Sequence, residues 1–488
     1  MERKTIIFFS RCELTQLYGK LSSQLEKKFN IIHVAYSHQE KKELLESYSI
    51  SDAVCFNDVF LECLKKSYSL TDIEKLDNFI LKRSNGRFNL NSSLQSDRTL
   101  IGYDYEAAIQ TILAYKRAWE LIFSNHENLN GFFIHEPVAL SMTQMAAYVS
   151  KDFHLKYLTN VQVYGVKKLN WIFCDGETGE LHTLANNRSE IKKIETKTKK
   201  FIENFRLNRK ENFFSFYQER GKGTWKSIEF LKLIFSIIKN LLHLIIEGVS
   251  KEKGSLGGNL DSFLKRSYQL NPYERIKQRI DRFLYFQFSE LNPDTNIDYY
   301  YYPIHMEPEA TVLYWANGTF KNQVKLIENI AAQLPPNTIL YVKDHPHGIG
   351  NRVIYDYFRI QAIPNVILLE PAIPGLEVTK VSKGVITING TTGLEGALLG
   401  KQVFILGSAF YDYFSCVIKL NSVFDLRIAM EDYYRKNRDD DRLIEDLSSL
   451  LMNSNEGFTD YFSDFVKKAG IDEENNLKDV LDGFLRLG

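Results

Sequence analysis

Cysteine is scarce in this sequence, and the cysteines that are present form no motif. Five of them are scattered over 488 residues, and no two have the CxxC spacing of a metal or redox site. An odd, scattered set excludes a disulfide scaffold and indicates no zinc site. We therefore expect the chain to work in a reducing, cytoplasmic compartment.

An excess of one charge is also missing. Lys and Arg together number 61, and so do Asp and Glu, so the basic surface of a general nucleic-acid binder is not expected. The hydrophobic share of 44% and the charged share of 25% are typical of a soluble globular protein. A chain of 488 residues is too long for one ordinary core, which predicts two domains.

Long hydrophobic runs are the third absence. The run at residues 5–9 is too short for the core of a signal peptide and predicts a first strand instead. The most apolar helix-length segment, residues 228–248, is interrupted by Lys232, Lys239 and His243, so it falls short of the roughly 18 to 20 apolar residues of a membrane span. Two interpretations stay open, a buried helix between domains and a helix that lies on the inner membrane surface.

Short apolar segments alternate with helical patterns along most of the chain. Such alternation is typical of βα units and predicts an α/β fold with parallel sheets. We expect strands at residues 5–9, 31–35, 131–134, 162–166, 171–173, 298–302, 339–342, 366–369 and 385–388. The predicted domains are an amino-terminal α/β domain (1–190), a helical insertion (191–290), a second α/β domain (291–420) and carboxyl-terminal helices (421–488).

A glycine-rich turn follows the predicted strand at 385–388 and opens a helix. Free backbone N–H groups at a helix start attract anions, glycine lets a phosphate approach closely, and threonine hydroxyls add donors. The turn has neither the Walker nor the GxGxxG spacing, so a plain strand-to-helix turn is the alternative. The candidate phosphate-binding residues are Gly390, Thr391, Thr392, Gly393 and Glu395.

A basic pair ends the predicted strand at 339–342. Lys343 and His345 can balance the charge of a phosphate, and Pro346 fixes the turn that carries them. Alone this pair favours a structural role. Together with the glycine-rich turn that follows a later strand, it predicts a nucleotide-phosphate site.

Two further groups of polar residues follow predicted strands. His305, Glu307 and Glu309 have an HxExE spacing, but the intervening proline interrupts a regular ladder, so we expect residues that line a substrate cleft rather than a metal site. His135 and Glu136 follow the strand at 131–134. They are candidates for catalytic residues at a ligand-facing edge, or they only cap the next helix.

Three stretches carry a resemblance to a known family. YYYYPIHMEPEAT, LPPNTILYVKDHP and VITINGTTGLEGALLGKQVFILGSAFY, which lie within residues 298–412, resemble bacterial capsular and surface polysaccharide biosynthesis proteins, which include GT-B glycosyltransferases. The resemblance implies two facing Rossmann-like domains, with a nucleotide-sugar donor on the second and an acceptor on the first. It implies a donor site at Lys343, His345, Pro346, Thr391, Thr392 and Glu395.

The His345–Pro346 pair is also similar to a motif of bacterial sialyltransferases and polysialyltransferases, which use cytidine monophosphate sugars. Their serine motif falls on Thr391 and Thr392 here, a departure that leaves the cytidine donor open. Their acidic pair before glycine is matched only in part, by Asp175, which we do not assign as the base.

The resulting hypothesis is a metal-independent glycosyltransferase with no cofactor, which acts at the inner face of the membrane on a glycan or lipid-linked glycan acceptor. Lys343 and His345 would stabilise the departing nucleotide phosphate. Glu136 or His135 would deprotonate the acceptor, with Glu307 as a further candidate base. The alternatives are a polyol-phosphate transferase, a nucleotide-sugar epimerase, and a non-catalytic partner in polysaccharide assembly.

Overall fold

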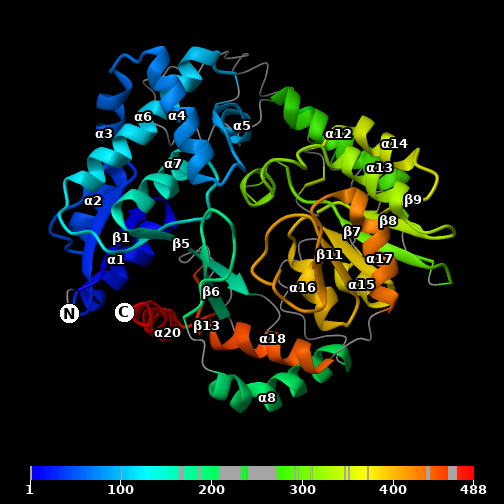
Figure 1. Ribbon diagram of the computed structural model, residues 1–488. Helices are drawn as coiled ribbons and strands as arrows, with labels where there is room; N and C mark the ends of the chain where they lie inside the picture. Colours follow the sequence, from blue (N-terminus) through cyan, green and yellow to red (C-terminus); the bar gives the residue numbers. More distant parts are fainter. Residues whose placement is uncertain are drawn as a thin grey trace.

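The computed structural model has two α/β lobes that lie side by side (Figure 1). It describes residues 3–459 and 470–488, apart from residues 101, 164–169, 185–187, 208–230, 232, 236, 240–271, 291–292, 295, 308, 310, 346–347, 350–351, 371–372 and 436–439. The following account concerns these described residues.

The first lobe is built on a sheet with the strand order β13-β6-β5-β4-β1-β2-β3. The strands β1 to β5 are parallel, and β6 and β13 are antiparallel additions at one edge. Their bounds are β1 Thr5–Ser10, β2 Asn30–Ala35, β3 Val54–Cys55, β4 Gly131–Ile134, β5 Leu155–Val163, β6 Asn170–Asp175 and β13 Ser454–Glu456.

Both faces of this sheet are covered, because alternate residues of a strand point to opposite sides. Ile7 and Phe9 of β1 pack in the core under α3, α6 and α7, whereas Ile6 and Phe8 face α1 and α20. The helices of this lobe are α1 Glu13–Leu25, α2 His38–Ser47, α3 Phe56–Leu64, α4 Leu70–Arg83, α5 Leu90–Ser96, α6 Tyr105–Ser124 and α7 Ser141–Ser150, with a 3-10 turn η1 at Lys151–Phe153.

The second lobe has a fully parallel sheet with the order β12-β11-β10-β7-β8-β9. In chain order this is the 3-2-1-4-5-6 arrangement of a Rossmann fold. The strands are β7 Tyr299–Pro303, β8 Ile339–Lys343, β9 Val366–Leu369, β10 Gly384–Thr387, β11 Gln402–Ile405 and β12 Val417–Lys419. The helices are α12 Pro272–Phe288, α13 Gln323–Gln333, α14 Ile354–Gln361, α15 Gly375–Val381, α16 Thr391–Leu398 and α17 Leu426–Arg435, with a 3-10 turn η4 at Val423–Asp425.

A π-helical turn, η3 (Thr311–Trp315), joins the two lobes. Tyr314 lies in the core of the first lobe, where it stacks on Phe88 with ring centroids 5.8 Å apart. The Trp315 indole N–H donates to the Gly176 carbonyl oxygen at 3.2 Å. The lobes are therefore held together by buried aromatic contacts next to the strand ends of both sheets.

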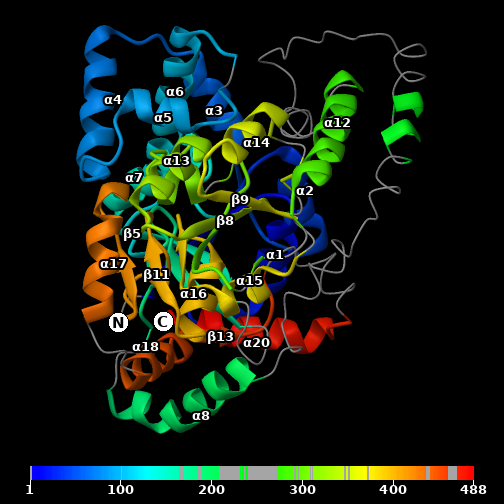
Figure 2. The same ribbon diagram turned by 90° about the vertical axis from the view of Figure 1, so that its right-hand side faces the viewer.

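The carboxyl-terminal segment returns to the first lobe. Helix α18 (Asp440–Met452) packs on α8 (Arg188–Leu207), β13 pairs with β6, and α20 (Glu473–Leu485) packs on α1. Figures 1 and 2 both show α8, α18 and α20 at the same end of the molecule. The tail that we expected to be helical thus also supplies a strand.

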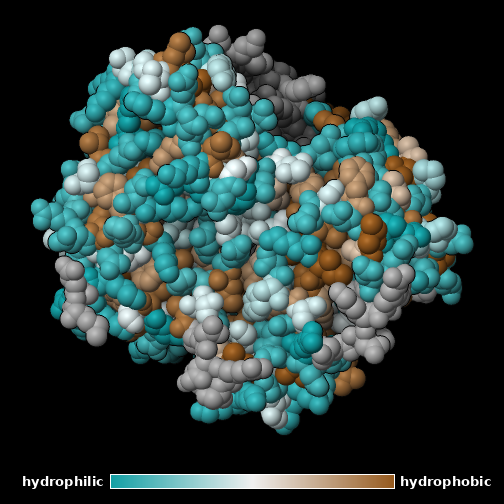
Figure 3. Space-filling view, viewed as in Figure 1, coloured by the Kyte–Doolittle hydropathy of each residue, from teal (hydrophilic) through white to brown (hydrophobic). Residues whose placement is uncertain are grey.

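The predicted α/β, GT-B-like fold class is confirmed by two Rossmann-like sheets. One strand was placed wrongly, because β5 begins at Leu155 and the prediction was 162–166. The polar residues in β5 hide the alternation of apolar and polar residues that would have indicated its start. Most of the apolar segment 228–248 lies outside the described residues. Across the part that is described, no helix has the length and apolarity needed to cross a membrane, and Figure 3 shows a mostly hydrophilic face with small hydrophobic patches.

Candidate functional site

The strands β7 and β10 lie side by side at the switch point of the second sheet, where chain connections leave in opposite directions. Open α/β sheets bind ligands outside the carboxyl ends of their strands at such a point. His305 follows β7, and its Nε2 atom lies 3.5 Å from the Thr387 hydroxyl oxygen at the end of β10. The Gly390 amide donates to the same hydroxyl at 3.1 Å. Burial lowers the pKa of His305 to about 4, so its ring is neutral at pH 7.

Helix α16 starts at this switch point. Gly390 is its N-cap, and no side chain caps the helix. The first-turn N–H groups therefore face the strand ends with the positive end of the helix dipole. A Cβ atom on Gly390 would lie 3.1 Å from His305 Nε2, so a larger residue here would require the His305 ring to shift. Thr391 and Thr392 are both partly exposed, and the helix start has the properties of an anion site.

A buried lysine stands beside this helix. Lys343, the last residue of β8, is 8% exposed. Burial lowers its pKa to about 8, while the charges of Asp344 and Glu395 oppose this shift. Burial raises the pKa of Glu395 to about 7, and Lys343 opposes that shift. At pH 7 the lysine is mostly protonated and the carboxyl is partly neutral, so this pair carries a net positive charge towards a ligand.

Hydrogen bonds to the Asp344 side chain hold the turn after β8 in place. The buried Asp344 carboxylate accepts a hydrogen bond from the His345 amide at 2.7 Å and another from the Tyr357 hydroxyl. These bonds leave the His345 side chain on the exposed side of the turn. Pro346, which was predicted to fix this turn, lies outside the described residues.

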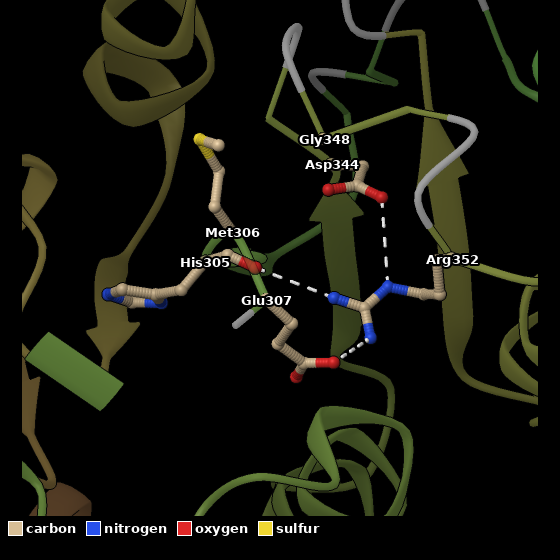
Figure 4. Close-up of a pocket in the computed structure, with 6 residues that line it drawn as sticks. All are labelled: His305, Met306, Glu307, Asp344, Gly348 and Arg352. Atoms are coloured by element: carbon tan, nitrogen blue, oxygen red, sulfur yellow. Dashed lines mark hydrogen bonds and ion pairs between the residues drawn. The ribbon is translucent and has the colours of Figure 1, made fainter. Parts of the chain in front are cut away.

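Arg352 fastens the segment after β7 to the turn after β8. Its guanidinium lies 2.7 Å from Glu307 Oε2 and 3.8 Å from Asp344 Oδ2, and Figure 4 shows it between these two carboxylates. The Gln323 side chain accepts from the His305 amide at 2.8 Å and donates to the His305 carbonyl oxygen at 2.9 Å. Because Glu307 is held in a partly buried ion pair with Arg352, its geometry suits a positioning role better than that of a base.

The residues around Arg352 enclose a cavity of about 30 Å³, which is room for a water molecule and not for a sugar. The His305 ring points away from this cavity (Figure 4). The side chains of His305 and Glu307 therefore point in different directions. Among the described residues, the one group of three or more His, Cys, Asp or Glu side chains close enough to hold a metal ion is elsewhere, in the first lobe.

Glu309 lies where the two lobes meet, just before η3. Burial raises its pKa to about 7, against the effects of a hydrogen bond from Thr311 and of the charge on Arg98. Arg98 belongs to the first lobe, between α5 and α6. A carboxyl group with a pKa near neutrality, at the boundary between two domains, is suited to general base catalysis.

The first sheet has its own switch point, between β1 and β4. His135 is 1% exposed there, and its Nδ1 atom lies 2.9 Å from the Phe9 carbonyl oxygen. Burial lowers the pKa of His135 to about 4. A ring so buried cannot reach an acceptor, so the interpretation of His135 as a base is corrected to a structural role. The Glu136 side chain is 48% exposed and lies 3.7 Å from Arg11, so it is accessible.

The structure thus brings most of the predicted second-lobe residues to one sheet edge. Asp175, which was not assigned, accepts backbone N–H bonds from Glu177 and Thr178 in the turn after β6. The residues that hold the site were missed: Asp344, Arg352 and Gln323. Asp344 could have been found from the sequence, because it is a polar residue directly after a predicted strand. Arg352 lies in a loop and Gln323 in a helix, and neither belongs to a motif that would have indicated its role.

Comparison with known proteins supports the resemblance. Residues 263–416 match the family described as capsule polysaccharide biosynthesis protein. This range contains the switch-point residues of the second lobe. No curated protein matches the chain by sequence.

Several solved structures are similar in arrangement. One is the KpsC beta Kdo 2,7 transferase of Thermosulfurimonas dismutans, with 10% identity, a TM-score of 0.34, and 75% of this chain and 89% of that chain covered. Another is the UDP-GlcNAc 2-epimerase of Neisseria meningitidis bound to UDP-GlcNAc, with 12% identity, a TM-score of 0.27, and 92% and 98% covered. Likeness at this level carries no argument about activity.

The match extends over β7 to β11 and their connecting loops. The resemblance to sialyltransferases stays a prediction. Over residues 263–416, this chain is similar to the capsule polysaccharide biosynthesis family, as its three sequence stretches predicted.

Proposed function

We propose that this protein is a glycosyltransferase of capsule or surface polysaccharide biosynthesis that uses a nucleotide-sugar donor. The observation that carries the proposal is that Lys343 and His345, at the end of β8, lie at the same edge of the second sheet as the uncapped start of α16, next to the switch point. All three favour a phosphate group, and the family match covers all three.

In this mechanism the second lobe stabilises the leaving nucleotide phosphate. The first-turn N–H groups of α16 and the hydroxyls of Thr391 and Thr392 donate to phosphate oxygens, while Lys343 and His345 supply positive charge. These groups are fixed before the reaction, so they need no reorganisation as negative charge develops. The proposed transfer uses protein groups alone and no metal ion.

Glu309 is our choice for the base that deprotonates the acceptor hydroxyl. Its pKa of about 7 allows it to be ionised in part of the molecules and still to bind a proton strongly. Its place between the lobes would let it face an acceptor bound on the first lobe. Glu136 is the second candidate because it is exposed at the first switch point.

We further propose that the protein works at the cytoplasmic side of a membrane. Scarce cysteines and the basic residues within the apolar segment 228–248 support this placement. The acceptor would then be a glycan or a lipid-linked glycan.

The test is a transfer assay with a panel of nucleotide sugars, cytidine monophosphate sugars among them, and glycan acceptors. We expect one donor to yield a lengthened glycan and a free nucleotide. Phosphorus retained in the acceptor product would identify a phosphotransferase, and turnover without an acceptor would identify an epimerase. If no cytidine, uridine or thymidine nucleotide binds in calorimetric titration, the proposal fails in favour of a non-catalytic partner.

A further inference from the structure

Three side chains of different metal-binding types meet in the first lobe, away from the site described above. His38, Cys55 and Asp58 each offer a ligand atom, and these atoms lie within 4.8 Å of one another. His38 Nε2 lies 2.9 Å from Asp58 Oδ1. Neither the family match nor the proposed transfer gives these residues a role.

The backbone of two neighbouring strands fixes this cluster. Ala35 at the end of β2 is paired with Cys55 at the end of β3. Helix α2 starts at His38, directly after its Ser37 cap, and α3 starts directly after Cys55, with Asp58 in its first turn. The three ligands thus stand on the starts of two helices whose places are set by the parallel sheet, which is the kind of rigid support that a metal site needs.

The donor types indicate which ion would fit. A thiolate, an imidazole and a carboxylate together suit Zn²⁺, whereas Mg²⁺ and Ca²⁺ prefer oxygen ligands. In a tetrahedral zinc site with bonds of about 2.0–2.3 Å, ligand atoms lie about 3.3–3.8 Å apart. The ligand atoms of the cluster lie within 4.8 Å of one another, so small movements would bring them to these separations. The side chains of His38 and Asp58 are 76% and 54% exposed and can turn without repacking the core.

Cys55 is the buried member of the cluster, and His38 and Asp58 are its exposed members. Burial raises the pKa of the Cys55 thiol, so the sulfur carries its proton until an ion binds. Because His38 and Asp58 are exposed, an ion can enter the cluster from solvent.

We propose that His38, Cys55 and Asp58 form a zinc-binding site that clips the start of α2 to the start of α3. Binding displaces the thiol proton of Cys55 into solvent and forms bonds from zinc to sulfur, to the imidazole nitrogen and to a carboxylate oxygen. The site is a structural clip on the first lobe and takes no part in the proposed sugar transfer, so its presence and that transfer are independent.

The test uses the full chain after treatment with a chelator, titrated with Zn²⁺ by calorimetry and with Co²⁺ by absorption spectroscopy. We expect one equivalent of Zn²⁺ to bind in the presence of millimolar Mg²⁺, and Co²⁺ to give a thiolate charge-transfer band. Cys55→Ser should remove the band; it leaves the fold intact because serine is a good N-cap. Cys63→Ser, which alters a buried thiol later in the same helix, is the matched control and should keep the band.

A second variant keeps the proposal open to refutation if Cys55→Ser is unstable. His38→Ala changes an exposed side chain and should weaken Zn²⁺ binding at least about tenfold, an effect comparable to the loss of an outer-sphere partner or larger. Equal Zn²⁺ binding by the wild type and both cluster variants would overturn the proposal. A charge-transfer band that persists in Cys55→Ser would do so as well.

Discussion

Replacing Lys343 by methionine removes the one buried cation that we assign to the donor phosphate. Methionine keeps a similar length and apolar stem, so the packing around the end of β8 should be preserved. Glu395 loses its partner in this variant. Its pKa, already raised to about 7 by burial, then rises further, so the carboxyl is neutral at pH 7 and no unpaired charge is buried. The fold should therefore remain stable.

The expected loss is in nucleotide binding. A hydrogen bond to a charged group contributes about 1.5–3 kcal/mol, and about 1.4 kcal/mol corresponds to a factor of ten in affinity. We therefore expect the Kd of the donor nucleotide to rise about ten- to hundredfold in Lys343→Met. The high burial of the lysine, which is 8% exposed, favours the upper part of this range because water screens the contact little.

Calorimetric titration with the nucleotide measures this change directly. Lys325→Met is the matched control, since Lys325 lies in the same lobe with a side chain that is 61% exposed and pairs with Glu328 at 3.0 Å. Its Kd should equal that of the wild type. Wild-type affinity in Lys343→Met, with an unchanged melting curve, would refute the assignment of this lysine to the phosphate.

Four further changes test the remaining parts of the account. His345→Ala should abolish sugar transfer and leave the fold intact, because the side chain is exposed; wild-type turnover would remove His345 from the mechanism. In the wild type, kcat/KM should rise as the pH passes about 7, where Glu309 loses its proton, and Glu309→Gln should lose both the activity and this rise; a rise that persists in the variant would exclude Glu309 as the base. Arg352→Leu removes the guanidinium beside the buried Asp344 carboxylate, which keeps its hydrogen bonds from His345 and Tyr357, so we expect a loss of at most about 3–5 kcal/mol of unfolding free energy. Burial raises the pKa of Asp344, and Arg352 opposes this shift, so the pKa rises further when Arg352 is replaced. The Asp344 carboxyl therefore holds its proton more tightly in the folded variant than in the unfolded chain. The stability of the variant should therefore fall as the pH rises, and a pH-independent loss in denaturant titrations would contradict this. Replacing Lys232 and Lys239 by Glu should reduce flotation with anionic liposomes, and unchanged binding would count against an electrostatic membrane contact.

The strands β7 to β10 of the second sheet could be predicted because each is a short apolar run that ends in a polar or glycine-rich turn, whereas β11 and β12 were not predicted. Parallel pairing then places those turns at one edge, so Lys343, His345 and the 389–393 turn were expected to be close. His305 was predicted only as part of a cleft. Its contact with Thr387 depends on β7 and β10 being neighbours, which is a property of the strand order.

Other features of the fold and the site could not be predicted, because they depend on contacts between segments that are distant in the sequence. His135 follows a strand as an active-site residue would, yet Phe9 and its neighbours bury it. Arg352 and Gln323 hold the turns in place through contacts between distant segments. The π-helical turn η3 was not predicted, because its buried aromatic face appears only when the first lobe packs against it.

The most direct test of the central claim is a crystal structure of the protein with the nucleotide that its transfer reaction releases. The account predicts that the phosphate lies against the N–H groups of Thr391 and Thr392 and within hydrogen-bond distance of Lys343 Nζ. A nucleotide bound instead at the switch point of the first sheet, beside Arg11 and Glu136, would contradict it.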